Sequence, residues 1–432
     1  VDALLSEHDP WFSLSHKPAQ TAKNERRAKL LDTSMDASIT LETGISEQST
    51  LSEFLGDVAQ YPHLVGQQPD LYRGFIERTF QNASVSGVIG LIHPESHLTE
   101  RKAIALRREA YLRLRRHWQF INELVLFDIS HLVKYGIHIY AQAQSSPYFL
   151  HAVSLYHPQT VIDSFAHDGT GELPGIKDDK DNWDLRPHKD RIITVNNETL
   201  GIWHSLLEAP DSSPLDSRMV FTVNTEAAGV LAKLAETSRI GDLKLQHSAG
   251  WHETSDRKRG FFESSWQHPD SWSEVILQGP HIGVSTPMIK QPNPSMKNNQ
   301  DWSPVDLEAT PKNFVPATAY LPTQNINNVE LSYGKWHLGS AEVSISSTFR
   351  VAWRAMASTT GVRTLYPAII PPGAKHVNGL VSAGPIQSRN EVAAIAGTSS
   401  LLTDYLVRAT GIANLYGTVF DGLPIGVSDA LS

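Results

Sequence analysis

The sequence predicts an α/β protein, and three observations within residues 70–143 support this class. Apolar side chains recur at helical spacing in residues 70–80, a short apolar run ending at a proline spans 87–94, and helical spacing returns at 100–118 among many arginines. Two strand-like runs, 120–127 and 135–141, then flank a polar turn. This order is typical of the second half of a Rossmann-like sheet that ends in an antiparallel hairpin.

Residues 70–141 are expected to form two helices, a buried strand and a hairpin. Residues 70–80 place Leu71, Phe75, Ile76 and Phe80 on one apolar stripe, which predicts an amphipathic helix. The run at 87–94 suits a central parallel strand that is buried on both faces. Residues 100–118 are expected to form a crossover helix on that sheet, and the hairpin strands follow it.

The remainder of the chain divides by composition. A glycine-rich, acidic stretch at 168–181 predicts a linker, and residues 227–237 predict a helix. From about residue 243, tryptophans, prolines and short apolar runs alternate, which favours a mixed α+β domain. The predicted domains are therefore 1–165, 166–242 for a linker with a small helical region, and 243–432.

Composition excludes several classes of protein and site. The 432 residues include no cysteine, which excludes disulfide scaffolds and thiolate metal sites, and no apolar run is long enough to span a membrane. Cytoplasmic residence is consistent with both. His247 and His252 lack a third ligand at a convincing spacing, so no metal site is predicted. Hydrolase turns, phosphate loops and the acidic pair with lysine of a nuclease are all missing from the sequence.

Four short motifs in this order carry a family resemblance. They are Asp-Leu-Tyr-x-x-Phe-Ile-Glu at 70–77, Gly-Val-Ile-Gly-Leu-Ile-His-Pro-Glu at 87–95, Ala-Leu-Arg-Arg-Glu at 105–109 and Asn-Glu-Leu-Val-Leu-Phe at 122–127. The succession resembles the later motifs of adenine-specific DNA methyltransferases, and above all the type IIG restriction-modification-like enzymes of phage defence, such as the BREX and DISARM methylases. Residues 272–287, 350–354 and 363–373 are similar to the distal recognition region of these enzymes.

The resemblance implies a methyltransferase sheet followed by a target-recognition domain, with S-adenosylmethionine as the cofactor and double-stranded DNA as the partner. It implies that Asp70 and Tyr72, together with His93 and Pro94, border the pocket for the target base. His93 could equally be a hydrogen-bonded structural group. Phe127 is expected to stack on the extruded adenine, and its alternative role is that of a core phenylalanine at a strand end.

Basic and amide side chains in the distal region are candidates for DNA contact, because arginine reads guanine and asparagine reads adenine. Arg257, Lys258 and Arg259 form a basic run in a polar loop, where solubility alone is an equal explanation. Arg350 and Arg354 could instead pair with nearby acids along one helix face. The remaining candidates are Arg363, His376 and Asn378. The net charge of −9 disfavours DNA binding without excluding it, since a local basic surface suffices.

The chain departs from the family in two motifs. It contains no Asn-Pro-Pro-aromatic turn and no glycine-rich cofactor loop. We therefore expect a fragment, a processed product or one half of a split enzyme, inactive alone and completed by an amino-terminal half or by other defence-system subunits. The alternative is a noncatalytic DNA-binding specificity subunit that retains the methyltransferase-like sheet.

Overall fold

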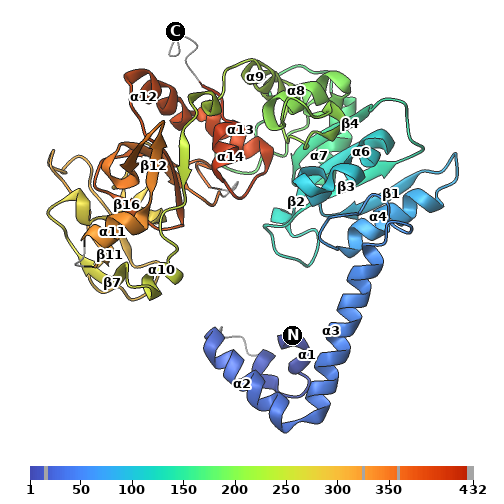
Figure 1. Ribbon diagram of the computed structural model, residues 1–432. Coiled ribbons are helices and arrows are strands. Elements are labelled where there is room, and N and C mark those ends of the chain that lie inside the picture. Colours follow the sequence, from blue (N-terminus) through green and yellow to red (C-terminus); the bar gives the residue numbers. More distant parts are fainter. Residues whose placement is uncertain (14–17, 324–325, 358–360, 426–432) are drawn as a thin grey trace. The chain divides into compact units, whose positions relative to one another are not determined.

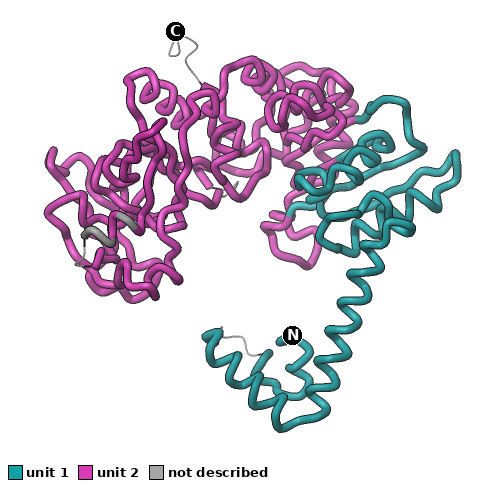
Figure 2. Tube along the Cα trace, in the orientation of Figure 1, with its two compact units in different colours: residues 1–117, 134–149 teal, residues 118–133, 150–432 magenta. Residues whose placement is uncertain are grey.

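The computed structural model describes residues 1–13, 18–323, 326–357 and 361–425, and it is a mixed α/β structure with several sheets (Figure 1). The chain divides into two compact units, which Figure 2 distinguishes by colour. Unit 1 comprises Val1–His117 and Lys134–Phe149, and unit 2 comprises Trp118–Val133 and Leu150–Ser432. No helix within the described ranges has both the length and the apolar character of a membrane span.

Unit 1 consists of amino-terminal helices and an α/β part. Its elements are α1 (Asp2–Leu5), α2 (Gln20–Thr33), α3 (Met35–Leu55), α4 (Leu71–Asn82), β1 (Ile89–His93), α5 (Ser96–Thr99), α6 (Ile104–Arg113), the first half of β2 (Leu114–Ile121) and β3 (Lys134–Tyr140). Asp2 on α1 pairs with Lys23 and Arg27 on α2, and α3 contacts both helices. The side chain of Leu55, at the end of α3, packs over Gly74 of α4.

The predicted hairpin is confirmed, with different bounds for its first strand. The amide of Ala141 donates to the carbonyl of Arg113, and that of Asn122 donates to Val133, so β2 and β3 run antiparallel. The predicted strand 120–127 begins earlier, at Leu114, and ends at Ile121. Val125 adopts a left-handed backbone with φ of 50°, which a strand does not accommodate.

The sequence-based prediction of a helix over 100–118 is therefore wrong beyond Arg113. Residues 114–118 pair with the returning strand instead of extending α6, because the ladder to β3 satisfies their backbone groups. Leu114 and Trp118 are four residues apart, a spacing that fits one face of a helix as well as one face of a strand, which is why spacing alone misassigned this segment.

The prediction of a parallel strand over 87–94 is also wrong. Strand β1 pairs antiparallel with β3, in a register that runs from Ile89 opposite Tyr140 to His93 opposite Gly136. The side chain of Ile92 is 56% exposed, so β1 is not buried on both faces. The hairpin brings β3 alongside β1, and this places His93 and His138 on adjacent strands.

Helix α4 forms as predicted, and half of its predicted apolar stripe is buried, namely Ile76 and Phe80. Leu71 and Phe75, predicted to be apolar contacts, are 54% and 67% exposed. The buried positions include Arg73 and Glu77, whose charges are satisfied by Glu100 and His63 respectively. Polar partners thus determine the orientation of α4 as much as its apolar stripe does.

Unit 2 begins with short α/β elements and ends in a β-rich part surrounded by helices. Its elements are β4 (Phe149–Leu155, which starts at the unit boundary), α7 (Pro158–Ala166), β5 (Ile193–Val195), α8 (Asn197–Leu207), α9 (Thr225–Ala235), β6 (Gln246–Ser248), α10 (Ser255–Lys258), β7 (Phe262–Gln267), β8 (Ile276–Leu277), β9 (Lys290–Pro292), β10 (Trp302–Pro304), β11 (Thr318–Pro322), α11 (Ile326–Tyr333), β12 (Lys335–Leu338), β13 (Ala341–Ser344), β14 (Arg350–Arg354), β15 (Pro367–Ile370), β16 (Lys375–His376), β17 (Leu380–Gly384), α12 (Arg389–Ala396), α13 (Leu401–Thr410) and α14 (Gly417–Asp421). Helix α9 confirms the helix predicted at 227–237.

The core of unit 2 surrounds a four-stranded sheet of order β15-β14-β17-β6. Trp353 on β14 stacks on Phe420 of α14 with ring centroids 3.9 Å apart. Residues 350–354, interpreted from the sequence as a possible helix face, are thus a strand in which Val351, Ala352 and Trp353 are all fully buried. A second apolar cluster packs Trp251 against Phe262.

Candidate functional site

Five titratable side chains of unit 1 converge in its interior. We call them the histidine cluster: His93 at the end of β1, Glu95 and His97 around α5, His117 on β2 and His138 on β3. All five are buried, and His97, His117 and His138 have no exposed surface. The rings of His93 and His138 stack at 3.9 Å, and His117 lies 2.6 Å from Glu95 through Nε2 and Oε1. Antiparallel pairing of β1 with β3 positions the stacked pair.

Hydrogen bonds fix the orientation of part of this cluster and leave other nitrogens unpaired. The Nδ1 atoms of His93 and His138 donate to the carbonyls of Pro94 and Gly136, at 2.7 and 3.1 Å. By contrast, Nδ1 and Nε2 of His97 and Nε2 of His138 are buried without a hydrogen-bond partner. Each unpaired buried polar atom costs about 1–3 kcal/mol, so three in one place require a physical reason.

Burial also holds these imidazoles neutral. Loss of hydration lowers the pKa of His93 to about 4 and lowers the pKa values of His97 and His138 well below the ordinary value. At neutral pH the three rings therefore have lone pairs on their unprotonated nitrogens. Two trios, His93–His97–His138 and Glu95–His117–His138, hold possible metal-ligand atoms within 4.8 Å of one another.

The predicted border of the base pocket falls partly at this cluster. Asp70 caps α4, since its carboxylate accepts from the amide of Tyr72 at 3.4 Å. The ring of Tyr72 stacks on His93 at 5.5 Å, and its hydroxyl lies 2.6 Å from Ser96. Pro94 is exposed, and its carbonyl accepts from the His93 ring. The structure thus brings Tyr72 and His93 together, whereas Asp70 serves the helix terminus.

Phe127 lies on the loop between β2 and β3 rather than at a strand end. The residue is 42% exposed, which is not the environment of a core phenylalanine. The fully buried amide of Asn122 fixes this loop: it donates to the carbonyls of Phe127 and Ile129, at 3.0 and 2.9 Å, and accepts from the amide of Phe127. The predicted stacking role is compatible with this exposure and stays a prediction.

Several predicted DNA contacts are instead part of the interior of unit 2. Arg350 is fully buried and donates to the carbonyls of Ile345 and Ala374. His376 is also fully buried, 2.8 Å from the hydroxyl of Ser382. The prediction that Arg350 and His376 contact DNA is wrong for this structure, because both side chains are enclosed by the protein.

Two other arginines are engaged with the protein. Arg354 donates to the carbonyl of Ile282 at 2.9 Å and lies over the ring of Tyr366. Arg363 pairs with Asp404 at 3.1 Å. Both therefore act in packing, so reading DNA would require these contacts to be exchanged. The alternative of Arg350 and Arg354 pairing with acids along one helix is also wrong, since they lie on strand β14 and bond to carbonyls.

The remaining predicted contacts are exposed, and one of them, Arg257, lines a cavity of unit 2. Arg257, Lys258 and Arg259 are exposed at α10, where Arg259 pairs with Asp256 at 3.2 Å. A cavity of about 630 Å³ is lined by side chains that include Arg257, Gln278, Lys297, Asn298 and Asn299. Asn378 accepts from the amide of Glu253, another lining residue. The structure therefore brings Arg257 and Asn378 to the same region, with amides, a lysine and the carboxylates of Glu253 and Asp301 beside them.

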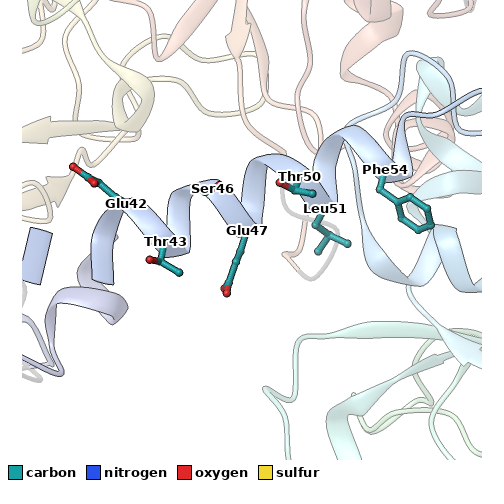
Figure 3. Close-up of a pocket in the computed structure, with 7 residues that line it drawn as sticks. All are labelled: Glu42, Thr43, Ser46, Glu47, Thr50, Leu51 and Phe54. Atoms are coloured by element: carbon teal, nitrogen blue, oxygen red, sulfur yellow. The ribbon is translucent and has the colours of Figure 1, made fainter. Parts of the chain in front are cut away.

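A hollow on helix α3 is less informative. Its lining consists of Glu42, Thr43, Ser46, Glu47, Thr50, Leu51 and Phe54, all along one helix (Figure 3). Two carboxylates with no cation in the lining disfavour phosphate, and side chains from a single helix do not converge on a ligand.

Sequence reasoning missed most of the histidine cluster. The prediction of no metal site considered His247 and His252, and the structure pairs His247 with Asp421 at 3.1 Å. The signal that could have been used is the His-Pro-Glu-Ser-His run at 93–97, which places two imidazoles and a carboxylate after a strand. Its partners His117 and His138 are distant in sequence and become neighbours only through the hairpin.

Comparisons with known proteins do not identify the chain. No protein-family model matches it, and no curated protein does. Among solved structures, the type IIG restriction endonuclease BpuSI aligns with a TM-score of 0.29 and 11% sequence identity over 89% of this chain. The chain spans less than half of that enzyme's length, since the alignment covers 46% of it. A TM-score of this size does not establish a common fold.

Proposed function

We propose that this chain is part of an adenine-specific DNA methyltransferase of the restriction-modification type, and that unit 2 binds duplex DNA. The observation that carries the proposal is the order of motifs over residues 70–127, which resembles that family. Unit 1 gives this order a spatial counterpart, because Tyr72 from the first motif stacks on His93 from the second. S-adenosylmethionine is the methyl donor in this proposal.

The division of roles follows from the chemistry of base methylation. The adenine must leave the helical stack, at about a few kcal/mol, and an exposed aromatic ring such as Phe127 can offset part of this by stacking. Methyl transfer also needs acceptors for the protons of the exocyclic amine, held in line with the donor. This sequence has no Asn-Pro-Pro-aromatic turn to provide them. The chain thus contributes DNA binding and base stacking to a reaction that other residues complete.

Methyl transfer by the purified chain alone is expected to be undetectable. The assay follows a labelled methyl group from S-adenosylmethionine to mixed-sequence duplex DNA, with and without a polypeptide that carries the missing turn and glycine loop. Activity only with the added polypeptide supports the proposal. Methylation by the chain alone contradicts it, and DNA binding without methylation in either mixture favours the noncatalytic specificity subunit.

Replacement of Arg257, Lys258 and Arg259 together by glutamine is expected to weaken duplex DNA binding by about tenfold or more at low salt. Each lost phosphate contact lowers the slope of log affinity against log salt by about 1, so the slope should fall by up to about 3. Fluorescence anisotropy across a salt series measures both quantities.

A matched control removes the same charge elsewhere in unit 2. Lys180, Lys233 and Arg389 are exposed, and their joint replacement by glutamine should leave the salt slope unchanged. If both triple variants lose the same affinity, binding depends on overall charge and not on contacts made by Arg257, Lys258 and Arg259.

The specificity-subunit alternative is favoured by one observation. The cavity beside Arg257 is lined by the amides of Gln278, Asn298 and Asn299, which are side chains able to donate to and accept from base edges. DNA binding by this surface needs no catalytic residue.

A further inference from the structure

The three unpaired nitrogens of the histidine cluster belong to two side chains from different elements. His97 is on α5 and His138 on β3, and both are fully buried. The centroids of both rings lie within 6 Å of the centroid of the His93 ring, so the two side chains with unpaired nitrogens are neighbours of a third imidazole. The three unpaired nitrogens thus lie beside the ring of His93, whose own Nε2 is 3.5 Å from the hydroxyl of Tyr140.

The tautomers of two rings follow from their backbone contacts. A carbonyl oxygen can only accept, so the hydrogen bonds to Pro94 and Gly136 place the protons of His93 and His138 on Nδ1. Each Nε2 then carries a lone pair. A backbone carbonyl that holds the second nitrogen of an imidazole is the outer-shell arrangement common at metal-ligating histidines.

Gly136 provides the space for this arrangement. A Cβ atom at this position would lie 2.3 Å from Cε1 and 2.8 Å from Nε2 of His138, and 3.1 Å from the carboxylate of Glu95. Any larger residue would have to displace the ring of His138, whose Nε2 is one of the unpaired nitrogens.

We infer that His93, His97 and His138 bind a divalent transition-metal ion of the zinc class through imidazole nitrogens. Three neutral nitrogen ligands favour zinc and its neighbours over magnesium or calcium, which prefer oxygen. Glu95 and His117, hydrogen-bonded to each other at 2.6 Å, lie beside the ion as outer groups. The inference is independent of the proposed methyltransferase function.

Metal binding would require a modest closure of the trio. The ligand atoms lie within 4.8 Å of one another, whereas nitrogens bound to tetrahedral zinc are about 3.3 Å apart when each bond is about 2.0 Å. His97 is the ring best able to move, because no hydrogen bond holds either of its nitrogens.

Titration of the chelator-treated full chain with ZnCl₂ in a calorimeter tests this site. We expect one tightly bound ion per chain and a rise in melting temperature with zinc. His97→Gln should weaken binding by about 100-fold or more and abolish the rise, and Gly136→Ala should act in the same direction. Since His97 makes no ring hydrogen bond, its replacement should leave the metal-free fold intact, which circular dichroism checks.

His131→Gln and His268→Gln are matched controls, because both histidines are exposed and outside the cluster. Each should bind zinc like the unaltered chain. Unchanged affinity in His97→Gln, or equal losses in the controls, would overturn the inference. X-ray absorption of the zinc-loaded unaltered chain gives a result independent of variant folding: imidazole nitrogens at about 2.0–2.1 Å are expected, and a shell of oxygens alone contradicts the site.

Discussion

The free energy of unfolding is expected to fall by about 5 kcal/mol between pH 7 and pH 4.5 through two histidines of unit 2. Both His281 and His376 are fully buried. Burial lowers the pKa of His281 to about 4 and that of His376 to about 3, and Arg350 near His376 adds to the second effect. Each pKa unit corresponds to about 1.4 kcal/mol, and pH 4.5 lies about two units below the unfolded value of about 6.5, so each histidine contributes about 2.5 kcal/mol to the loss.

The direction of the effect follows from which state binds the proton. Below about pH 6.5 the unfolded chain protonates these histidines while the folded chain does not, so acid favours unfolding. The loss begins near pH 6.5 and continues towards the folded pKa values. The contacts of His281 show why the folded chain keeps this ring neutral. Its Nδ1 accepts from the amide of Gln278 at 2.9 Å, and its Nε2 lies 2.9 Å from the carbonyl of Ala317. Protonation of Nδ1 would break the first of these bonds.

Urea unfolding at several pH values, followed by tryptophan fluorescence, measures this loss. The slope of the unfolding free energy against pH gives the difference between the numbers of protons bound by the unfolded and the folded chain. His281→Gln should reduce the slope even if it also destabilises the fold. His268→Gln, at an exposed position, should leave it unchanged. A free energy that is constant from pH 7 to 4.5 would contradict the buried neutral state.

The sequence predicted the elements whose signals are local. Helix α4 begins after Asp70 because that carboxylate caps the first turn, and β3 follows the alternation at 135–141. Helix α9 begins after Asn224, whose side chain accepts from the amide of Ala227. Caps and alternation depend on neighbours within a few residues, so a single sequence contains them.

Features that depend on distant partners were not predictable in this way. Residues 114–118 become a strand because β3 returns beside them, and the burial of Arg73 depends on Glu100. The histidine cluster combines residues from positions 93 to 138, and only their register on adjacent strands brings them together. The sequence also does not show that a charged residue in a strand is buried. Arg350 is an example, because its partners are backbone carbonyls, which have no signature in the sequence.

Arg350→Ala is expected to lower the free energy of unfolding by about 3–5 kcal/mol. It should remove no contact to DNA, because Arg350 is fully buried. Two buried carbonyls, those of Ile345 and Ala374, would lose their donor, and the space of a guanidinium would be left beside the ring of Tyr333, which lies 5.9 Å away. Breaking a buried charged contact by removing one partner typically has this magnitude.

Arg350→Lys tests whether the planar geometry of the guanidinium or its positive charge alone is responsible for the contribution of Arg350 to stability. A single ammonium cannot reproduce the planar donors that reach Ile345 and Ala374 at the same time, so we expect most of the destabilisation to remain. Arg257→Ala is the comparison at an exposed arginine, where the expected change in unfolding free energy is within about 0.5 kcal/mol. Urea unfolding measures all three variants at one pH.

Measurement of DNA affinity on the same variants distinguishes the two roles of arginine in unit 2. A structural Arg350 predicts that Arg350→Lys, at temperatures where it is folded, binds duplex DNA as the unaltered chain does, whereas Arg257→Ala binds less tightly. The opposite pattern, a stable Arg350→Lys with reduced affinity, would restore Arg350 as a DNA contact. It would also require β14 to leave the sheet on binding, because its guanidinium is otherwise enclosed by the core.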